Sequence, residues 1–383
     1  MKIRLVMITE IISPYRIPLF NALAREAAVE LHVIFLSETD PELRQWLVYK
    51  NEIHFSYEVL PSRRYRVAGY TMLLNYGLTR QLRAFSPDVI LCGGYNYPAS
   101  WQALLWARTY AVPFLLWSES NEQDARDGYA FLEILKSAFL RSCSGFVVPG
   151  RSASAYLLGR KISQSQIFTA PNAVDNGLFA AAADLARKNA SARRSQLGMP
   201  ERYILFVGRL VREKGVFDLL SAYATLDAQT RAEVGLVYAG DGVCRIEMEK
   251  QSASISPGTV KFAGFVQRDD LAPYYALAEM LVLPTYTDTW GLVVNEAMSC
   301  GLPIVLSQVA GCAADLVADK RNGLLVPPGD PIALAQALRT LISGSDSRAR
   351  MASANLQLIS HYSPAAWSRH ITEALAAMKP KND

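Results

Sequence analysis

The sequence predicts an α/β fold made of two doubly wound parallel sheets. Along the 383 residues, short apolar runs alternate with longer amphipathic stretches, which is typical of strands covered by helices on both faces. This alternation pauses once, at the turn-forming stretch 170–177, and then restarts. The length corresponds to roughly two to three domains of ordinary size. We therefore expect two Rossmann-like domains that face each other across a cleft.

Each domain is predicted element by element from its apolar runs and amphipathic stretches. In the first domain, strands are expected at residues 3–9, 31–36, 88–91, 114–117, 145–148 and 167–169, and helices at 18–28, 72–84, 99–110 and 131–141. In the second domain, a helix is expected at 180–197 and strands at 203–207, 234–239, 260–262, 280–283, 304–306 and 324–326. The domains should span residues 1–172 and 173–362. A final helix, 363–383, has Pro at its first turn, and we expect it to pack back toward the first domain.

Composition excludes several classes of protein. Lys and Arg total 39 and Asp and Glu total 35, a net charge of +4, whereas nucleic-acid binders concentrate more positive charge on one face. Five cysteines without a C-x-x-C pair do not indicate a disulfide framework or a zinc ribbon. No apolar stretch approaches the roughly 18 residues of a membrane-spanning helix, and the first apolar run is too short for a signal peptide. A cytosolic protein that binds no nucleic acid is predicted.

A short basic loop follows the first strand of the second domain. Gly208 permits a sharp turn, and Arg209 and Lys214 stand five positions apart before a helix. An Arg fork and a Lys point charge can neutralise a diphosphate. For these cations taken alone, an ordinary solvated loop is an equally good interpretation. The glycine turn 240–242, after the next strand, permits either close approach of a ligand or simply a tight strand-to-helix turn.

A second loop, after the strand at 280–283, carries two acidic residues. Asp288 lies in the loop itself, and Glu296 lies inside the helix that follows. That helix starts at Gly291, Leu292 and Val293, whose free N–H groups form an anion site. A carboxylate such as Glu296 can accept hydrogen bonds from a ribose diol. The alternative is that both acids simply favour the start of a helix, which explains Asp288 better than Glu296.

Several motifs are arranged as in a known family. They are Gly208-Arg209-Leu210 with Lys214-Gly215, Asp288 and Glu296 with seven residues between them, Glu296-Ala297-Met298 with Gly301-Leu302-Pro303, Pro171-Asn172-Ala173-Val174-Asp175, and Phe262-Ala263-Gly264-Phe265-Val266. Together they resemble the donor domain of family-four retaining glycosyltransferases of the GT-B fold. The resemblance covers nearly all of the C-terminal half and the general layout of the N-terminal half.

The resemblance implies transfer of a sugar from a nucleotide-diphosphate sugar, with retention of configuration. It implies that Arg209 and Lys214, beside Gly208, hold the diphosphate and that the backbone around Val266 lies against the base. Glu296 would hold the ribose, and the loop from Asp288 to Leu292 the sugar. The family usually has Glu where this chain has Asp288, whose side chain is one methylene shorter. A uridine donor is favoured over a guanosine donor on family frequency, and no separate cofactor is expected.

The first domain should provide the remaining site residues. Glu119 follows the strand 114–117, where many relatives have a His, so it is the candidate polar group beside the sugar. An N-cap role for Glu119 is the alternative. Tyr15 and Arg16, after the first strand, and Asn96, after the third, are candidates for binding a glycan or lipid-linked acceptor.

The segment Arg63-Arg64-Tyr65-Arg66 mixes cations with an aromatic residue. Such a loop can contact an anionic lipid surface at the inner face of the cell membrane. A solvated basic loop is an equally good interpretation of the same residues.

The resemblance therefore implies a retaining glycosyltransferase. No D-x-D motif stands at a strand end in the expected cleft, so we expect the reaction to need no metal. The catalytic candidates are Arg209, Lys214, Asp288 and Glu119. The expected pathway is synthesis of a cell-envelope polysaccharide, lipopolysaccharide or glycolipid. A GT-B nucleotide-sugar epimerase or hydrolase is the alternative function.

Overall fold

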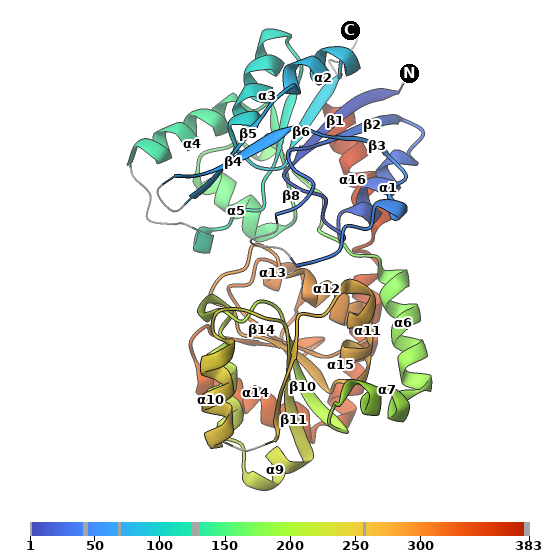
Figure 1. The fold of residues 1–383 in the computed structure, drawn as a ribbon, viewed down its shortest axis with the longest axis vertical. Coiled ribbons are helices and arrows are strands. Elements are labelled where there is room, and N and C mark those ends of the chain that lie inside the picture. Colours follow the sequence, from blue (N-terminus) through green and yellow to red (C-terminus); the bar gives the residue numbers. More distant parts are fainter. Residues whose placement is uncertain (1, 41–44, 68–69, 125–129, 256–257, 379–383) are drawn as a thin grey trace. The chain divides into compact units, whose positions relative to one another are not determined.

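The computed structural model describes residues 2–40, 45–67, 70–124, 130–255 and 258–378 (Figure 1). The chain forms two compact units, of which the first contains Met1–Ala173 with Pro364–Asp383 and the second contains Val174–Ser363. Each unit has its own parallel sheet, so the predicted α/β fold with two doubly wound sheets is confirmed. The assignment of acceptor binding to residues 1–172 and of donor binding to residues 173–362 stays a prediction.

The first unit is built on a parallel sheet. Within the described residues its strand order is β3-β2-β1-β6-β7-β8-β9. The strand numbers fall from β3 to β1 and rise from β6 to β9, so the order along the sheet reverses between the parallel strands β1 and β6. All residues of β6, β7 and β8 are buried, because helices cover both faces of a parallel sheet. The strands are β1 (Ile3–Thr9), β2 (Val29–Phe35), β3 (Ser56–Val59), β6 (Val89–Cys92), β7 (Phe114–Trp117), β8 (Gly145–Val148) and β9 (Ile167–Thr169).

The C-terminal helix belongs to the first unit. Its buried residues recur at the spacing of one helix face, as in Trp367, Ile371 and Leu375. The Trp367 ring lies 6.0 Å from that of Phe20 and 5.4 Å from that of Trp117, so this helix packs beside α1 (Figure 1). The helices of the unit are α1 (Ile17–Ala24), α2 (Leu78–Phe85), α3 (Pro98–Thr109), α4 (Ala130–Ser142), α5 (Arg151–Gly159) and α16 (Pro364–Ala377), with short 3-10 turns η1 (Lys50–Glu52), η2 (Glu122–Asp124) and η3 (Gln164–Gln166).

An antiparallel ribbon corrects two expectations. β4 (Ser62–Val67) pairs with β5 (Tyr70–Asn75), with Arg64 opposite Leu73. The basic segment 63–66 is therefore a strand rather than a loop, and the helix expected at 72–84 is wrong over its first residues, since α2 begins only at Leu78. A short apolar run such as Met72–Leu74 fits either element, and here the partner strand decides.

The second unit has a parallel sheet of the same kind. In the described part of the unit, the strand order is β12-β11-β10-β13-β14-β15 and reverses direction between β10 and β13. The strands are β10 (Arg202–Val207), β11 (Val234–Ala239), β12 (Val260–Gly264), β13 (Met280–Leu283), β14 (Ile304–Ser307) and β15 (Gly323–Val326). The helix expected at 180–197 is two helices, α6 and α7, which are separated at Asn189.

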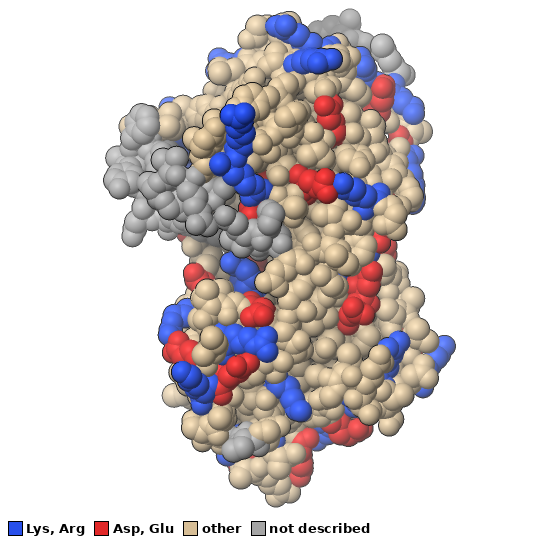
Figure 2. Space-filling model, in the orientation of Figure 1, with Lys and Arg blue, Asp and Glu red and all other residues tan. Residues whose placement is uncertain are grey.

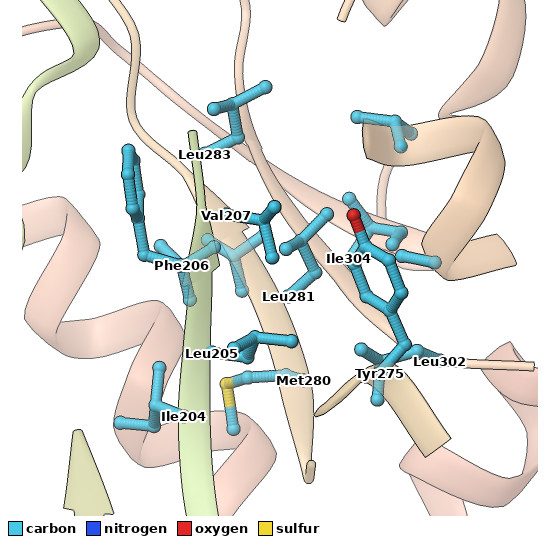
Figure 3. Packing of buried hydrophobic residues seen from close by; sticks show 14 of the residues in the cluster. Ile204, Leu205, Phe206, Val207, Tyr275, Met280, Leu281, Leu283, Leu302 and Ile304 are labelled. Atoms are coloured by element: carbon cyan, nitrogen blue, oxygen red, sulfur yellow. The ribbon is translucent and has the colours of Figure 1, made fainter. Parts of the chain in front are cut away.

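The core of the second unit lies between its sheet and the flanking helices. Figure 3 shows the apolar side chains of β10 and β13 with those of Leu302, Ile304 and Tyr275. Tyr275 brings a hydroxyl group into this apolar environment. The helices are α6 (Asn176–Lys188), α7 (Ala190–Leu197), α8 (Val216–Ala224), α9 (Ala228–Glu233), α10 (Arg245–Ile255), α11 (Arg268–Leu277), α12 (Leu292–Ser299), α13 (Ala313–Leu316), α14 (Pro331–Ser343) and α15 (Ser345–Ile359), with the 3-10 turn η4 (Arg212–Lys214).

The surface carries charges of both signs. Figure 2 shows acidic side chains interspersed with basic ones on the face drawn, in keeping with the net charge of +4. Among the described residues, none of the helices combines the length and apolar character needed to cross a membrane.

Candidate functional site

The candidate site of the second unit lies where the strand order reverses. β10 and β13 are neighbours in the sheet. The chain leads from each of them to a helix on its own side of the point where the strand order reverses. Loops that follow two such strands diverge and leave a crevice at the carboxyl edge, where open α/β sheets bind ligands. The predicted residues Gly208 to Lys214 follow β10, and Asp288 to Glu296 follow β13. The topology therefore brings the two predicted loops together.

Hydrogen bonds to a backbone carbonyl join these loops directly. The Glu213 carbonyl accepts hydrogen bonds from the Thr285 hydroxyl at 3.0 Å and from the Tyr286 N–H at 2.9 Å. Gly215 has a φ of +66°, and a Cβ there would lie 2.0 Å from the Pro284 carbonyl oxygen. The two loops thus pack so closely that one of them requires glycine.

The second glycine turn supports the same site from the other side. A Cβ on Gly240 would lie 1.9 Å from the Gly208 carbonyl oxygen, and one on Gly242 would lie 2.4 Å from that of Leu210. The close approach at this turn is therefore made by the chain's own backbone. Of the two interpretations of the glycine turn, the structure supports a tight packing role, which holds Gly208 in place.

The two predicted cations differ in their surroundings. Arg209 is exposed, and within the described part of the chain it has neither an ion pair nor a side-chain hydrogen bond. Lys214 Nζ lies 2.6 Å from Asp288 Oδ2 and donates to the Thr287 carbonyl at 3.1 Å. The predicted diphosphate ligand Lys214 and the predicted sugar ligand Asp288 are thus partners of each other.

Helix α12 begins beside this ion pair. Its N-cap is Gly291, with a φ of +99°, and the side chains of Leu292 and Val293 pack against the core. The first N–H groups of a helix have no partner within the helix and carry partial positive charge. The buried indole of Trp290 donates to Asn295 Oδ1 at 2.8 Å, which fixes the chain at the entry to the helix. These N–H groups follow the loop that carries Asp288, and their use as an anion site stays a prediction.

Glu296 lies on the second turn of α12 and is held by a residue that the sequence did not reveal. The Tyr275 hydroxyl donates to Glu296 Oε2 at 2.6 Å. The side chain of Glu296 keeps some exposed surface, but burial of its carboxyl group raises the pKa from 4.5 to about 7, and the Tyr275 hydrogen bond only partly offsets this. Near neutral pH the carboxyl can therefore exist in either protonation state.

The segment predicted to face a base has one exposed aromatic residue. Val266 is partly buried and packs against the core of the unit, so its side chain is largely occupied. The preceding Phe265 is 41% exposed, so its ring is accessible from solvent and can stack against a planar ligand.

The first unit has its own group of polar residues at the carboxyl edge of its sheet. Arg16 donates to the Thr9 hydroxyl at 2.8 Å, and its guanidinium lies 4.5 Å from the centre of the Trp117 ring. It also lies 3.6 Å from Glu119, which accepts a hydrogen bond from Asn172 at 3.2 Å. The structure thus brings the predicted residues Arg16 and Glu119 together within this unit.

The other acceptor candidates are arranged differently. Tyr15 makes an edge contact with Trp46 at 5.8 Å between ring centres, whereas Asn96 is exposed. Sequence reasoning missed the short hydrogen bond from Tyr97 to Glu10. Burial and the Glu10 carboxylate raise the pKa of Tyr97. Glu10 follows β1 and Tyr97 follows the neighbouring β6, so a search of both strand ends could have found this pair.

The basic segment on β4 is partly neutralised. Arg64 forms an ion pair with the buried Asp40 at 2.9 Å. Arg63 is exposed, and Tyr65 is 41% exposed. The side chain of Arg66 lies outside the described residues. Of the described side chains in this segment, Arg63 and Tyr65 are accessible to a partner.

The described residues contain no group of three or more His, Cys, Asp or Glu side chains that could hold a metal ion. Metal independence of the reaction stays a prediction.

Comparison with known protein families gives two matches, one mainly over the first unit and one within the second. Residues 19–177 match the model described as Glycosyltransferase Family 4, and residues 188–357 match the model described as Glycosyl transferases group 1. The second match contains both loops of the candidate site. Together the two models cover most of the chain.

Among curated relatives, the D-inositol 3-phosphate glycosyltransferase of Salinispora arenicola is 32% identical over 220 residues, which are 53% of this chain and 48% of that protein. The Alpha-D-kanosaminyltransferase of Streptomyces kanamyceticus is 34% identical over 167 residues, 42% of this chain and 43% of that protein. The chain thus spans about half the length of the curated relatives it matches.

Solved structures are similar over the whole chain. HepE of Anabaena in complex with UDP and glucose has a TM-score of 0.76 at 18% identity, covering 98% of this chain and 100% of that chain. This likeness establishes the fold, a GT-B fold. The two family matches, to residues 19–177 and 188–357, show that the chain belongs to the group 1, family 4 glycosyltransferases.

Proposed function

We propose that this protein transfers a sugar from a nucleotide-diphosphate sugar to a hydroxyl group of an acceptor, with retention of configuration. The observation that carries the proposal is the arrangement at the ends of β10 and β13. In the proposal, the exposed cation Arg209, the cation Lys214 and the N–H groups at the start of α12 hold the diphosphate. Glu296 is one turn further along α12, where it can accept hydrogen bonds from a ribose.

The donor is a UDP-sugar in this proposal. The similar Anabaena protein was solved with UDP and glucose, and the exposed Phe265 ring offers a stacking surface for a base. Binding of UDP, GDP and ADP and of their glucose conjugates should be compared by calorimetry. Tighter binding of GDP or ADP than of UDP would overturn the choice of base.

The chemistry requires stabilisation of charge more than proton transfer by side chains. The bond between the anomeric carbon and the diphosphate oxygen breaks, and a bond to the acceptor oxygen forms on the same face. The leaving diphosphate takes the acceptor's proton. Negative charge develops on the diphosphate, where Arg209, Lys214 and the α12 N–H groups are pre-arranged to stabilise it.

The acceptor is a glycan or lipid-linked hydroxyl in the synthesis of a cell-envelope polysaccharide, lipopolysaccharide or glycolipid. Arg16, with Glu119, and the exposed Asn96 are its proposed ligands in the first unit. The test is release of UDP from a UDP-sugar with and without candidate acceptors, followed by NMR of the product's anomeric configuration. Equal release without any acceptor would instead indicate a hydrolase, and an inverted product would exclude retention.

Contact with an anionic membrane is part of the proposal, with Arg63 and Tyr65 on β4 as contact residues. Arg64 is less suited, because Asp40 already holds it at 2.9 Å. Sedimentation with phosphatidylglycerol vesicles should weaken in the Arg63→Ala variant. Equal binding of that variant and the unmodified protein would remove this segment from the proposed contact.

A further inference from the structure

Tyr275 on α11 places a hydroxyl group inside the apolar core of the second unit. The side chain has no exposed surface, and its ring packs edge-on against that of Phe179 with 6.2 Å between the ring centres. Taking a hydroxyl group out of water costs free energy unless it forms a hydrogen bond. Here it donates to Glu296 Oε2 at 2.6 Å. A phenylalanine would fill the same space without this cost, so core packing alone does not explain the hydroxyl group (Figure 3).

Three other buried tyrosines of the second unit use their hydroxyl groups differently. Tyr203, Tyr223 and Tyr238 donate to backbone carbonyl groups at distances of 2.7 to 3.2 Å. Such bonds join the backbones of neighbouring elements. Tyr275 instead donates to the side-chain carboxylate of Glu296, on the next helix along the chain. Its hydrogen bond therefore fixes a candidate ligand-binding group rather than the backbone.

This hydrogen bond favours the form of Glu296 that suits a ribose. An ionised carboxylate only accepts hydrogen bonds and has about four lone pairs, so acceptor capacity remains for two ribose hydroxyl groups. Burial favours the protonated form and raises the pKa of Glu296 to about 7, whereas the hydrogen bond from Tyr275 lowers that pKa. Without the Tyr275 hydroxyl, more of the carboxyl would be protonated at neutral pH.

The titratable and charged groups around this carboxyl lie on three helices. Tyr275 is on α11, Cys300 follows the last residue of α12, and Arg187 and Asp184 on α6 lie near Cys300. Burial raises the pKa of Tyr275 and that of Cys300 far above neutral pH. Tyr275 and Cys300 therefore keep their protons between pH 6 and pH 9, whereas Glu296 titrates in that range.

We propose that Tyr275 is a positioning residue for nucleotide binding, whose hydroxyl group holds the Glu296 carboxylate as a hydrogen-bond acceptor for the ribose. This inference deepens the proposed function and rests on it. Because Tyr275 has no exposed surface, we expect it to act through Glu296.

The test is binding of UDP to the Tyr275→Phe variant, measured by calorimetry at pH 7 and pH 9. The variant keeps the ring but removes a hydrogen bond to a charged group, so Glu296 should hold its proton about tenfold more tightly. The ionised fraction at pH 7 then falls from about one-half to about one-tenth, and UDP should bind roughly fivefold more weakly. At pH 9 Glu296 is mostly ionised in both proteins, so the loss should shrink to less than about twofold.

Two controls isolate the effect of the hydroxyl group on the ribose. Tyr223→Phe removes a buried hydroxyl that donates at 2.8 Å to the carbonyl of Val234, the first residue of β11, and should leave UDP affinity unchanged at both pH values. The second control is a ligand, 2′,3′-dideoxy-UDP, which keeps the base and the diphosphate but lacks the ribose hydroxyl groups. Tyr275→Phe should bind it as tightly as the unmodified protein does.

A double variant tests whether Tyr275 acts through Glu296. Tyr275→Phe combined with Glu296→Gln leaves no carboxyl group at this position, and it serves as the second variant if Tyr275→Phe alone does not fold. It should bind UDP as tightly as Glu296→Gln alone at pH 7 and at pH 9. Weaker binding by the double variant would show that Tyr275 acts independently of Glu296, and the inference would be wrong.

The remaining outcomes separate this inference from the proposed function. An unchanged UDP affinity of Tyr275→Phe at pH 7 would overturn the inference, and so would a loss that is equal at both pH values or equal for UDP and 2′,3′-dideoxy-UDP. If the unmodified protein binds these two ligands equally tightly, Glu296 does not hold the ribose, and the inference fails although a nucleoside diphosphate binds. If the unmodified protein binds none of UDP, GDP and ADP, the proposed function fails together with the inference.

Discussion

The stability of the folded protein should depend on pH through the carboxyl group of Glu296. Burial raises its pKa from 4.5 to about 7 in the folded chain, so folding favours the protonated form. The stability that this preference contributes is fully present below pH 4.5 and is lost as pH rises through about 7. At pH 8 the ionised carboxylate therefore lowers the free energy of unfolding of the unliganded protein. Replacing Glu296 with Gln keeps the shape and removes the charge.

The size of the effect follows from the two pKa values. Each tenfold change in the proton equilibrium corresponds to about 1.4 kcal/mol, so the ionised carboxylate costs the fold at most about 3 kcal/mol. Glu296→Gln should be more stable than the unmodified protein at pH 8 by up to that amount. The difference should shrink steadily as the pH falls to 5.

The same carboxylate should make nucleotide binding depend on pH. If the ribose binds the ionised form, about one-tenth of the protein is competent at pH 6 and about nine-tenths at pH 8, and apparent affinity scales with that fraction. UDP should therefore bind roughly tenfold more tightly at pH 8 than at pH 6. Glu296→Gln should lose the part of this dependence that does not come from the nucleotide's own phosphates.

Denaturant unfolding at pH 5, 6, 7 and 8 and calorimetry with UDP test both statements. The control variant is Glu233→Gln, which changes an exposed carboxyl at the end of α9 and should show no such trend. An equal stability difference between Glu296→Gln and the unmodified protein at pH 5 and pH 8 would refute the reasoning. A less stable Glu296→Gln at every pH would refute it as well.

Three other changes test separate parts of the structure. Arg209→Ala should weaken UDP binding by about tenfold to one-hundredfold, which is the usual contribution of a charged hydrogen bond, and should leave thermal stability unchanged. An unchanged affinity measured by calorimetry would contradict the diphosphate role. Gly240→Ala should lower the melting temperature measured by circular dichroism, since its Cβ would lie 1.9 Å from the Gly208 carbonyl oxygen; a melting temperature within a degree of the unmodified protein would contradict the packing described. Trp367→Ala should destabilise the first unit by about 3–5 kcal/mol, as for other buried Trp residues, measured by denaturant unfolding; a loss near zero would show that α16 does not hold that unit together.

Much of the architecture could be predicted because parallel strands buried on both faces require continuous apolar runs. Strands such as Met280–Leu283 and Phe114–Trp117 were expected with the bounds that the structure shows. The ribbon of β4 and β5 was missed because Arg63 to Arg66 carry no apolar alternation. Their pairing with Tyr70–Asn75 depends on a partner strand, which a local pattern does not reveal.

The candidate site shows the same division. Gly208, Arg209, Lys214 and Glu296 were predicted because they follow strands at spacings that suit a diphosphate and a ribose. Tyr275 was not predicted, since it lies on a different helix from Glu296, 21 residues away, and looks like an ordinary core aromatic in the sequence. Its role depends on the position of one hydroxyl group among apolar side chains (Figure 3).

The sequence by itself determined the two α/β sheets, the loops that follow their strands and the residue types available for a nucleotide sugar. These features depend on local periodicity and on short spacings, which the chain carries along its length. Only the tertiary structure decided that Lys214 pairs with Asp288, 74 residues further on, and that Trp367 packs against Trp117 in the first unit. The physical reason is that such contacts depend on strand order and helix packing, which bring distant residues together through the energy of the whole fold.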